Sequence, residues 1–408
     1  MLTDIVKFAI LGLGAGAIYG LSALGIVLIY RGSGVLNFAQ GAVGMVGAYV
    51  FYLNRADGVP APLAALFAIG VGALIGVITH LGVMRPLRNA PAVSRLIGTL
   101  AVFSFLYGFG QYRWGVNQAR IVSAVLPTSS WEILPGIRIG TDRLVILAIG
   151  VVLTAALTVV YRRSTFGLST SAVAENRRAS SAVGVSPDVI ATVNWVLGSV
   201  LAVCSAILIV SIGTLQVESL TLLVFPALAA ALLGGFKSYP LTFLGGLLIG
   251  ILESEVAFIG TKWSIGDGWG KTVPFIVIIG VLMLTGRALP MRGEATERPP
   301  EIGTGRVPVR KLVIASAIAL VLILFWFSPG MLSAIEISLA VGLVVMSVVV
   351  VTGYAGQLSL AQMALAGMGA WIAARLVANW GVPFELALVI GVVGTIPIGI
   401  AVGLPALR

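Results

Sequence analysis

The chain carries one stretch twice: LNFAQGAVGMVGAYV at residues 36–50 returns as LSLAQMALAGMGAWI at residues 358–372. Six of the fifteen aligned positions are identical, at a constant offset of 322 residues. Two shorter matches follow in the same order and at nearly the same offset: Gly58-Val59-Pro60 with Gly381-Val382-Pro383, and Leu87-Arg88 with Leu407-Arg408. Three ordered matches are hard to explain by chance similarity between apolar segments, so the sequence predicts an internal repeat.

Both copies lie in segments that are apolar enough to cross a membrane. Hydrophobic residues make up 59% of the chain, charged residues 10%, and the mean hydropathy is +1.08, whereas a soluble domain carries about 25% charged residues. A spanning helix needs about 20 mostly apolar residues. Such runs lie at 5–30, 35–54, 61–83, 94–112, 143–161, 189–212, 217–235, 239–260, 273–290, 311–328, 331–352, 358–378 and 383–405. Barrel strands would be shorter and would alternate in polarity, so we expect an all-α polytopic membrane protein with about 13 transmembrane helices.

Basic residues gather in three of the predicted loops and indicate which face is cytoplasmic. The clusters are Arg85, Arg88 and Arg95; Arg162, Arg163, Arg177 and Arg178; and Arg287, Arg292, Arg298, Arg306, Arg310 and Lys311. Even numbers of predicted spans separate the clusters, so all three fall on one face. An excess of Lys and Arg marks the cytoplasmic side. This placement explains the net charge of +10 without a nucleic-acid partner.

The repeat divides the chain into two parallel copies. The span that precedes each matching stretch crosses in the same direction, as in transporters whose halves are related by an axis along the membrane normal. We expect a first half at 1–290, a polar cytoplasmic linker rich in Pro and Gly at 291–310, and the N-terminal part of a second half at 311–408. The second copy is much shorter than the first, so we expect a fragment, or else missing helices that another polypeptide supplies.

Polar side chains occupy corresponding positions near the start of the two repeated stretches. They are Asn37, Gln40, Ser359 and Gln362. Polar groups at membrane depth are costly unless they find partners, and the glycines that follow Gln40 would permit a broken helix. Interrupted helices in corresponding positions of two repeats indicate a transport pathway. The alternative is that these side chains only bond neighbouring helices.

Small residues also recur at helical spacing. Gly12, Gly16 and Gly20 lie on one face of the first predicted helix, and Gly246 and Gly250 share a face of another. Small residues four apart let helix backbones approach closely in lipid. We therefore interpret both sets as packing contacts.

The predicted cytoplasmic stretch 169–185 is polar, rich in alanine and compatible with a helix. It ends near Gly184, a residue suited to a helix C-terminus. A short helix outside the membrane between two spans could dock a partner. An ordinary charged loop is the alternative.

Residues for catalysis or metal binding are scarce. His80 is the single histidine of the chain and Cys204 the single cysteine, and one imidazole makes neither a metal site nor a catalytic triad. The stretch Gly266–Thr272 resembles a phosphate-binding loop, but Ile265 stands where that pattern requires glycine. We expect no cofactor, no metal and no enzymatic activity.

The chain resembles the permease family of branched-chain amino acid ABC transporters. The resemblance of the first copy rests on Leu36–Gly41, on Ala172–Asn176, and on Ala231–Phe236 leading to Gly245-Gly246. Residues 310–408 resemble the start of the second permease of that system, through Gly353–Ser359 and Gly403–Arg408. The combination implies a fusion of two permeases.

The resemblance implies a multi-pass protein of the bacterial inner membrane that imports branched-chain or similar hydrophobic amino acids. Its partners would be two cytoplasmic ATP-binding subunits, a periplasmic or surface-anchored solute-binding protein, the remainder of the second permease half, and membrane lipid. The segment that would meet an ATPase carries Ala172, Ala174, Glu175, Asn176, Arg177 and Gly184. In the family, histidine usually stands where this chain has Gln40. Permeases for urea, short amides or sugars on the same scaffold therefore stay open, with a channel or a membrane scaffold as further alternatives.

Overall fold

The structure is a computed structural model that describes residues 2–116, 118–122, 126–134, 137–264, 266–285, 308–355, 359 and 361–403. Most of the expected linker at 291–310 lies outside these residues. By contact, the chain divides into two units, Met1–Ala295 and Thr296–Arg408.

The described residues are almost entirely helical, which confirms the all-α polytopic fold. Within the described ranges, eight helices are long and apolar enough to cross a membrane: Asp4–Ser33, Ala61–Met84, Ala92–Trp114, Thr141–Arg163, Pro187–Val210, Tyr239–Lys262, Pro329–Gly353 and Phe384–Gly403. Shorter apolar stretches lie at Val217–Leu233 and Gly268–Leu284. A two-stranded hairpin of β1 (Ser130–Leu134) and β2 (Ile137–Gly140) follows α4 (Ala92–Trp114), a feature that the sequence analysis did not predict.

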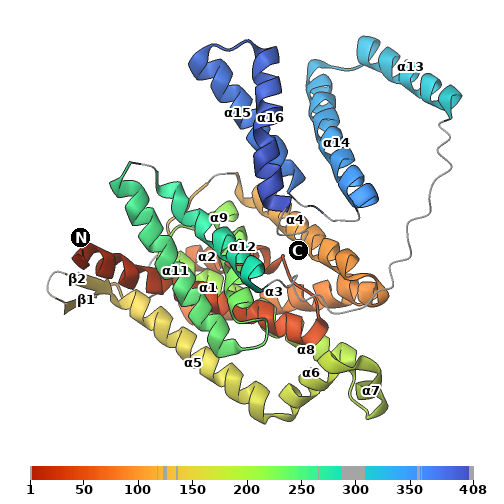
Figure 1. The fold of residues 1–408 in the computed structure, drawn as a ribbon. Helices are drawn as coiled ribbons and strands as arrows, with labels where there is room; N and C mark the ends of the chain where they lie inside the picture. The colour runs from red at the N-terminus through yellow and green to blue at the C-terminus, as the bar shows by residue number, and fades with distance from the viewer. Residues whose placement is uncertain are drawn as a thin grey trace. The chain divides into compact units, whose positions relative to one another are not determined.

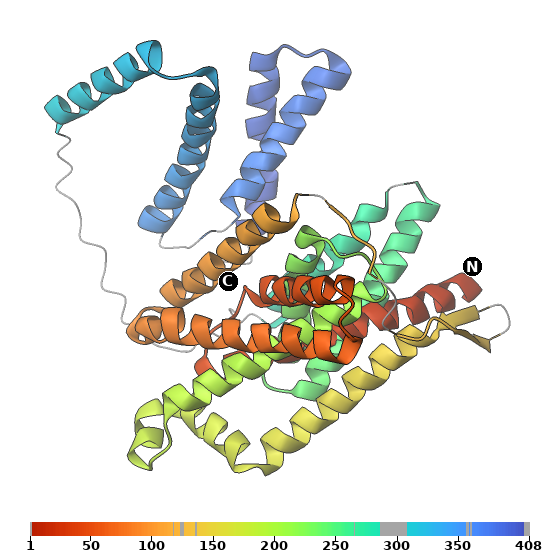
Figure 2. The same cartoon turned by 180° about the vertical axis from the view of Figure 1, so that it is seen from behind.

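The first unit is built around α1 (Leu2–Ser33), whose middle turns are buried on all sides. Helices α5 (Thr141–Arg163), α8 (Pro187–Val210), α10 (Val224–Leu233) and α11 (Tyr239–Lys262) pack against it (Figure 1). On α8 also pack α2 (Gln40–Ala56) and α3 (Ala61–Ile78), the orange-red helices of Figure 2. The protein core therefore lies between α1 and α8.

Glycines set the distance between α1 and α11. A Cβ atom on Gly16 would lie 2.8 Å from the carbonyl oxygen of Gly246, and one on Gly12 would lie 2.5 Å from that of Gly250. No side chain fits at such distances, so the two backbones touch directly. The predicted packing role of these glycines is confirmed.

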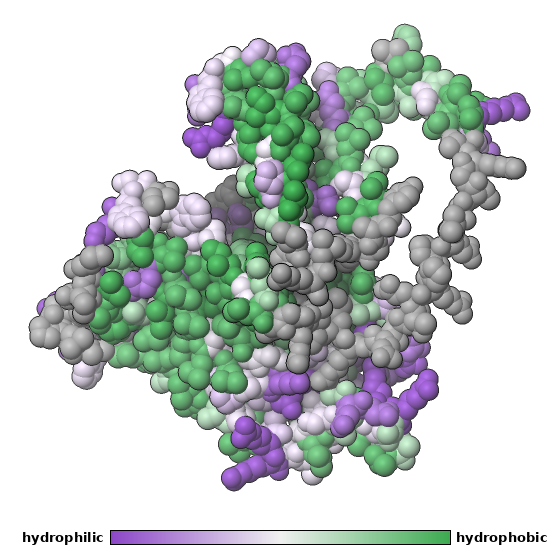
Figure 3. All heavy atoms as spheres, in the orientation of Figure 1, coloured by the Kyte–Doolittle hydropathy of each residue, from purple (hydrophilic) through white to green (hydrophobic). Residues whose placement is uncertain are grey.

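The outer surface of α11 is apolar. Its exposed large side chains include Leu241, Leu244, Leu248 and Leu252, which recur at helical spacing. Figure 3 shows the apolar surface over this helix and the hydrophilic side chains gathered around α6 (Thr165–Glu175) and α7 (Arg177–Ala182). An apolar face of this kind is what lipid contact requires.

Two expectations about helix continuity are wrong. The predicted span 217–235 consists of two short helices, α9 (Val217–Thr221) and α10. Helix α2 is unbroken through its glycines, because they provide close packing instead: a Cβ atom on Gly44 would lie 2.7 Å from the carbonyl oxygen of Ala202 on α8. The interruption comes before α2, between Ser33 and Gln40.

The second unit contains α13 (Val309–Phe325), α14 (Pro329–Ala355), α15 (Gln362–Trp380) and α16 (Phe384–Gly403). One helix start in this unit repeats a helix start of the first unit. The starts of α2 and α15, at Gln40 and Gln362, are 322 residues apart. The described residues just before α15, Ser359 and Ala361, are not helical, as the residues just before α2 are not.

The match of Gly58 with Gly381 also has a structural basis. Both glycines have positive φ angles, +83° and +63°, just after α2 and α15. Residues with a side chain rarely adopt this conformation. The remaining described elements are η1 (Thr79–Met84), η2 (Pro86–Asn89), η3 (Asp267–Thr272) and α12 (Val273–Thr285).

Candidate functional site

The interruption before α2 is organised by two buried amides. Asn37 Oδ1 accepts a hydrogen bond from the backbone N–H of Ala39 at 3.0 Å, and Asn37 Nδ2 donates to Gln40 Oε1 at 3.2 Å. An asparagine that bonds the backbone two residues further on stabilises a turn. This turn presents Gln40 as the first residue of α2.

Gln40 in turn joins α2 to two other helices. Its Nε2 donates to the carbonyl oxygen of Ser22 on α1 at 3.3 Å and to that of Gly198 on α8 at 3.0 Å. Gly25 leaves room for this amide, since a Cβ atom there would collide with Gln40 Nε2 and lie 2.7 Å from the Gly198 oxygen. The side chain of Gln40 is fully buried, so all its polar atoms are matched inside the protein.

The second copy repeats this arrangement with a serine in the first position. Gln362 Nε2 donates to Ser359 Oγ at 3.4 Å, and Gln362 Oε1 accepts from Ser347 Oγ on α14 at 3.1 Å. The structure therefore brings together Asn37 with Gln40, and Ser359 with Gln362. In both copies the first residue of a helix bonds the polar residue three positions before it and reaches the preceding helix.

The predicted partner-docking stretch forms two helices, not one. Asn176 leaves the helical conformation, with φ −150° and ψ 102°, and its Oδ1 accepts a 3.0 Å hydrogen bond from the N–H of Ala179. Asparagine is a favoured residue at the start of a helix, so it ends α6 and begins α7. This corrects the expectation of a single helix over 169–185.

The predicted terminal glycine is confirmed. Gly184 has a φ angle of +87° after the end of α7. The N–H of Val185 bonds the carbonyl of Ser180 at 3.0 Å, and the N–H of Gly184 bonds that of Ser181 at 3.1 Å. This pair of bonds is the Schellman motif, which satisfies the last carbonyls of a helix.

Helix α6 meets the end of α1 at a polar cavity. The cavity has a volume of about 340 Å³ and is lined by Arg31, Ser171, Ala174, Glu175 and Lys237. Arg31 donates to Ser171 Oγ at 3.2 Å, and its guanidinium carbon lies 5.7 Å and 5.2 Å from the ring centroids of Tyr161 and Tyr239. Cation–π contacts of this kind hold an arginine in a defined orientation.

A buried asparagine that the sequence analysis overlooked ties α6 to α8. Asn194 Oδ1 accepts a 2.6 Å hydrogen bond from the hydroxyl of Tyr161. Asn194 Nδ2 donates to Thr170 Oγ1 on α6 at 3.4 Å and to the carbonyl of Ile190 at 2.8 Å. The sequence did indicate this residue, because an amide side chain inside the apolar run 189–212 needs hydrogen-bond partners.

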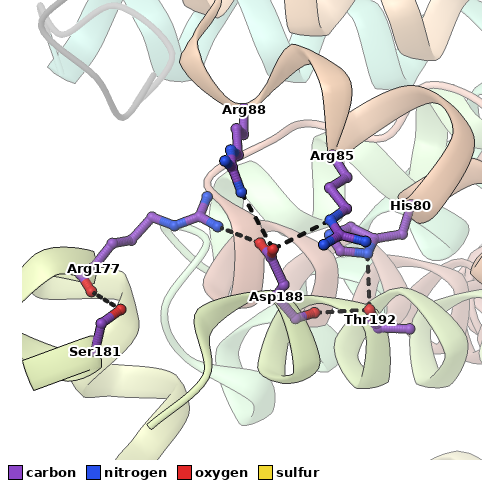
Figure 4. Close-up of polar contacts among 7 residues, drawn as sticks. All are labelled: His80, Arg85, Arg88, Arg177, Ser181, Asp188 and Thr192. Carbon is purple, nitrogen blue, oxygen red and sulfur yellow. Dashed lines mark hydrogen bonds and ion pairs between the residues drawn. The ribbon is translucent and has the colours of Figure 1, made fainter. Parts of the chain in front are cut away.

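Asp188, at the start of α8, forms ion pairs with three arginines. Its Oδ1 lies 3.0 Å from Arg177, and its Oδ2 lies 3.3 Å from Arg85 and 3.4 Å from Arg88 (Figure 4). The backbone carbonyl of Asp188 accepts from Thr192 Oγ1, which also contacts His80 Nδ1 at 2.9 Å. From the sequence, Arg85 and Arg88 were interpreted only as topology signals and Arg177 also as part of the coupling segment, so their contacts with Asp188 were not predicted.

Metal ligands are not assembled in the part of the chain that the structure describes: no three His, Cys, Asp or Glu residues lie close enough to hold an ion. The polar side chains of these sites are amides, hydroxyls and guanidiniums, together with the carboxylates of Glu175 and Asp188 and the ammonium group of Lys237. Such groups can bind a polar solute or a protein partner by hydrogen bonding.

Comparison with known proteins gives one consistent result. The family model described as branched-chain amino acid transport system / permease component matches residues 8–282. A probable branched-chain amino acid transport permease protein LivH of Methanocaldococcus jannaschii is 29% identical over 277 residues, which cover 65% of this chain and 85% of that protein. The high-affinity branched-chain amino acid transport system permease protein BraD of Pseudomonas aeruginosa is 28% identical over 285 residues, covering 67% and 91%.

Among solved structures, PsaBC from Streptococcus pneumoniae in complex with Fab matches with a TM-score of 0.40 and 13% sequence identity. The match covers 71% of this chain and 97% of that one.

Proposed function

Because the chain belongs to the family of branched-chain amino acid transport system permease components, we propose that it is the membrane subunit of an ATP-driven importer in the bacterial inner membrane. The solute that this family membership supports best is a branched-chain or similar hydrophobic amino acid. The observation that carries the proposal is the family match over residues 8–282.

The proposal assigns residues 1–290 to a first permease half and residues 311–408 to a second, with the linker at 291–310 between them. The repeated helix start supports this division, since α2 and α15 begin 322 residues apart. Parallel halves around a common axis are an architecture that transporters use.

The proposed translocation pathway runs past Asn37 and Gln40 in the first half and past Ser359 and Gln362 in the second. Paired polar residues at helix interruptions in both copies support it. In this conformation Gln40 is bonded to α1 and α8 and is fully buried. Opening of the pathway would then require the bond to Ser22 or to Gly198 to break.

The proposed coupling site for a cytoplasmic ATP-binding subunit consists of Ala172, Ala174, Glu175, Asn176, Arg177 and Gly184. Two such subunits and a solute-binding protein would complete the importer. Glu175, Asn176 and Gly184 are exposed, and Val183, next to Gly184, is 79% exposed. A surface that combines exposed polar groups with an exposed apolar side chain is suited to binding a protein partner.

The test is uptake of labelled leucine, with urea and ribose as competing solutes, in proteoliposomes. They would contain the full-length permease, its ATP-binding subunits and its solute-binding protein. We expect ATP-dependent leucine uptake, which falls at least tenfold in E175Q. The matched control is E132Q, which removes an exposed carboxylate on the β1 strand and should leave uptake unchanged.

The possible results separate the parts of the proposal. Uptake of urea or ribose in place of leucine would overturn the solute assignment and keep the importer. Flux without ATP would overturn the importer itself. Equal uptake by E175Q and E132Q would remove Glu175 from the coupling site.

A further inference from the structure

Four arginines from separate parts of the first unit line one narrow cleft. Arg85 and Arg88 come from the turns after α3, Arg95 from the start of α4, and Arg177 from the start of α7. Asp188 is the acidic residue that lines it with them. We call this feature the arginine cleft.

The charges of the arginine cleft do not balance. The carboxylate of Asp188 contacts three guanidinium groups, so these four side chains together carry an excess of two positive charges. Asp188 accepts one contact each from Arg85, Arg88 and Arg177. A guanidinium has five N–H donors, so each of these arginines engages Asp188 with only part of its donor set.

The same three arginines are open to the surroundings. Their side chains are 55%, 51% and 40% exposed for Arg85, Arg88 and Arg177, respectively. Figure 4 shows them converging on Asp188 from two backbone segments, Arg85 and Arg88 from one and Arg177 from the other. An incoming anion would therefore contact several guanidinium groups at once, because Asp188 already holds the three arginine side chains close together.

The position of the arginine cleft selects the type of anion. It lies where the candidate span Ala61–Met84 ends and the span Ala92–Trp114 begins, which is the depth of lipid headgroups. Basic pockets between spans on the cytoplasmic side bind phosphate-bearing headgroups. Arginine also matches phosphate geometry, because two parallel N–H groups can bond two oxygens.

We propose that the arginine cleft is a binding site for a phosphate-bearing anion, presented either by the headgroup of an anionic phospholipid or as free phosphate. The site is separate from the proposed solute pathway at Gln40 and shares Arg177 with the proposed coupling site. Asp188 competes with the anion for Arg85, Arg88 and Arg177, and it keeps these side chains together when the anion is absent.

The experiment titrates the purified full-length chain, in a neutral detergent, with dihexanoyl phosphatidylglycerol, with dihexanoyl phosphatidylcholine and with inorganic phosphate. We expect saturable binding of the anionic lipid that weakens with added salt, and little binding of the zwitterionic lipid. Competition by inorganic phosphate at similar concentrations would assign the site to free phosphate. Its absence would assign the site to the lipid headgroup.

The variant R85Q/R88Q should weaken binding at least tenfold. Its matched control is R162Q/R163Q, which removes two exposed charges at the end of α5, away from the arginine cleft. Thermal unfolding of both variants shows whether they are folded. Equal loss of binding in the two variants would mean general attraction to a basic surface and would overturn the proposal.

D188N provides a test in which the expected result is tighter anion binding, which a misfolded variant would not show. Removal of the competing carboxylate raises the net charge of the cleft and should tighten binding severalfold. Unchanged or weaker binding by D188N would overturn the proposal, as would the absence of saturable binding of both the anionic lipid and phosphate by the unaltered chain.

Discussion

Asn194 on α8 accepts a 2.6 Å hydrogen bond from the hydroxyl of Tyr161 on α5, and both side chains are buried. The same asparagine donates to Thr170 on α6. One helical turn further along α8, the carbonyl of Gly198 receives the amide of Gln40. Hydrogen bonds and one turn of helix thus connect the proposed coupling helix with the proposed pathway.

A double-mutant cycle should detect the bond between Tyr161 and Asn194. Y161F and N194L each leave a buried polar atom without its partner, so each should lower the free energy of unfolding by about 1–3 kcal/mol. The double variant should be less destabilised than the sum, by about 0.5–2 kcal/mol. Denaturant unfolding in detergent measures the free energy of unfolding of the unaltered chain, the two single variants and the double variant.

The control cycle pairs Y161F with S205A. Ser205 lies on the same helix as Asn194, but its hydroxyl bonds the carbonyl of Ala202. These two changes should therefore add. Additivity in the Tyr161–Asn194 cycle as well would contradict the bond.

Gly16 should not tolerate a larger residue. In G16A the new Cβ atom would lie 2.8 Å from the carbonyl oxygen of Gly246 and from the Cα atom of Leu247. Separating α1 from α11 by overpacking should lower the free energy of unfolding by about 1–3 kcal/mol. G70A is the control: no atom lies within 4 Å of a Cβ atom there, so its melting temperature should stay the same or rise, since alanine favours helix.

The fold was largely predictable because its signals are local. Apolar length identifies spanning helices, and identical residues at one offset identify the repeat, down to the helix starts at Gln40 and Gln362. The close-packing role of the glycines on α1 and α11 also follows from their spacing, whereas the pairing of these two helices with each other does not. Helix continuity was less predictable, since the glycines of α2 serve packing against α8, a contact between segments about 160 residues apart in sequence.

The site was only partly predictable. The amide pair and the terminal glycine of α7 are local patterns, and the structure places them as bonded groups. The contacts of Asp188 with Arg85 and Arg88 depend on how α3 and α8 pack, and sequence spacing does not contain that information. Asn176 shows a local signal that was missed, because a residue that favours helix starts stood within a stretch interpreted as one helix.

Arg31 should transmit movement of α6 to α1. It donates to Ser171 and lies against the rings of Tyr161 and Tyr239. R31K keeps the charge but loses the planar group that stacks on both rings. In the reconstituted importer we expect leucine uptake per ATP hydrolysed to fall about fivefold, a coupling loss of about 1 kcal/mol, with association of the ATP-binding subunits retained.

The control for R31K is R163K, at an exposed position at the end of α5, which should leave the ratio of uptake to hydrolysis unchanged. Loss of subunit association in R31K would point instead to a docking role for Arg31. An unchanged ratio in R31K would show that the contact with Ser171 transmits nothing.

Gln40 and Gln362 provide the test of pathway against packing. Q40L removes the donors to Ser22 and Gly198 and leaves Asn37 Nδ2 without its acceptor, so a drop in stability of about 1–3 kcal/mol is expected in either case. If Gln40 lies in the pathway, its substitution must also lower transport by the molecules that remain folded. Leucine uptake per folded molecule should fall at least tenfold in Q40L and in Q362L.

Folded protein is therefore measured in the same proteoliposomes, and uptake is divided by that amount. Q40H supplies the conservative variant, because imidazole restores a hydrogen-bond donor at this position; it should keep most of the uptake. If Q40L lowers the melting temperature but transports at the unaltered rate per folded molecule, the amides only hold helices together. The pathway must then lie elsewhere.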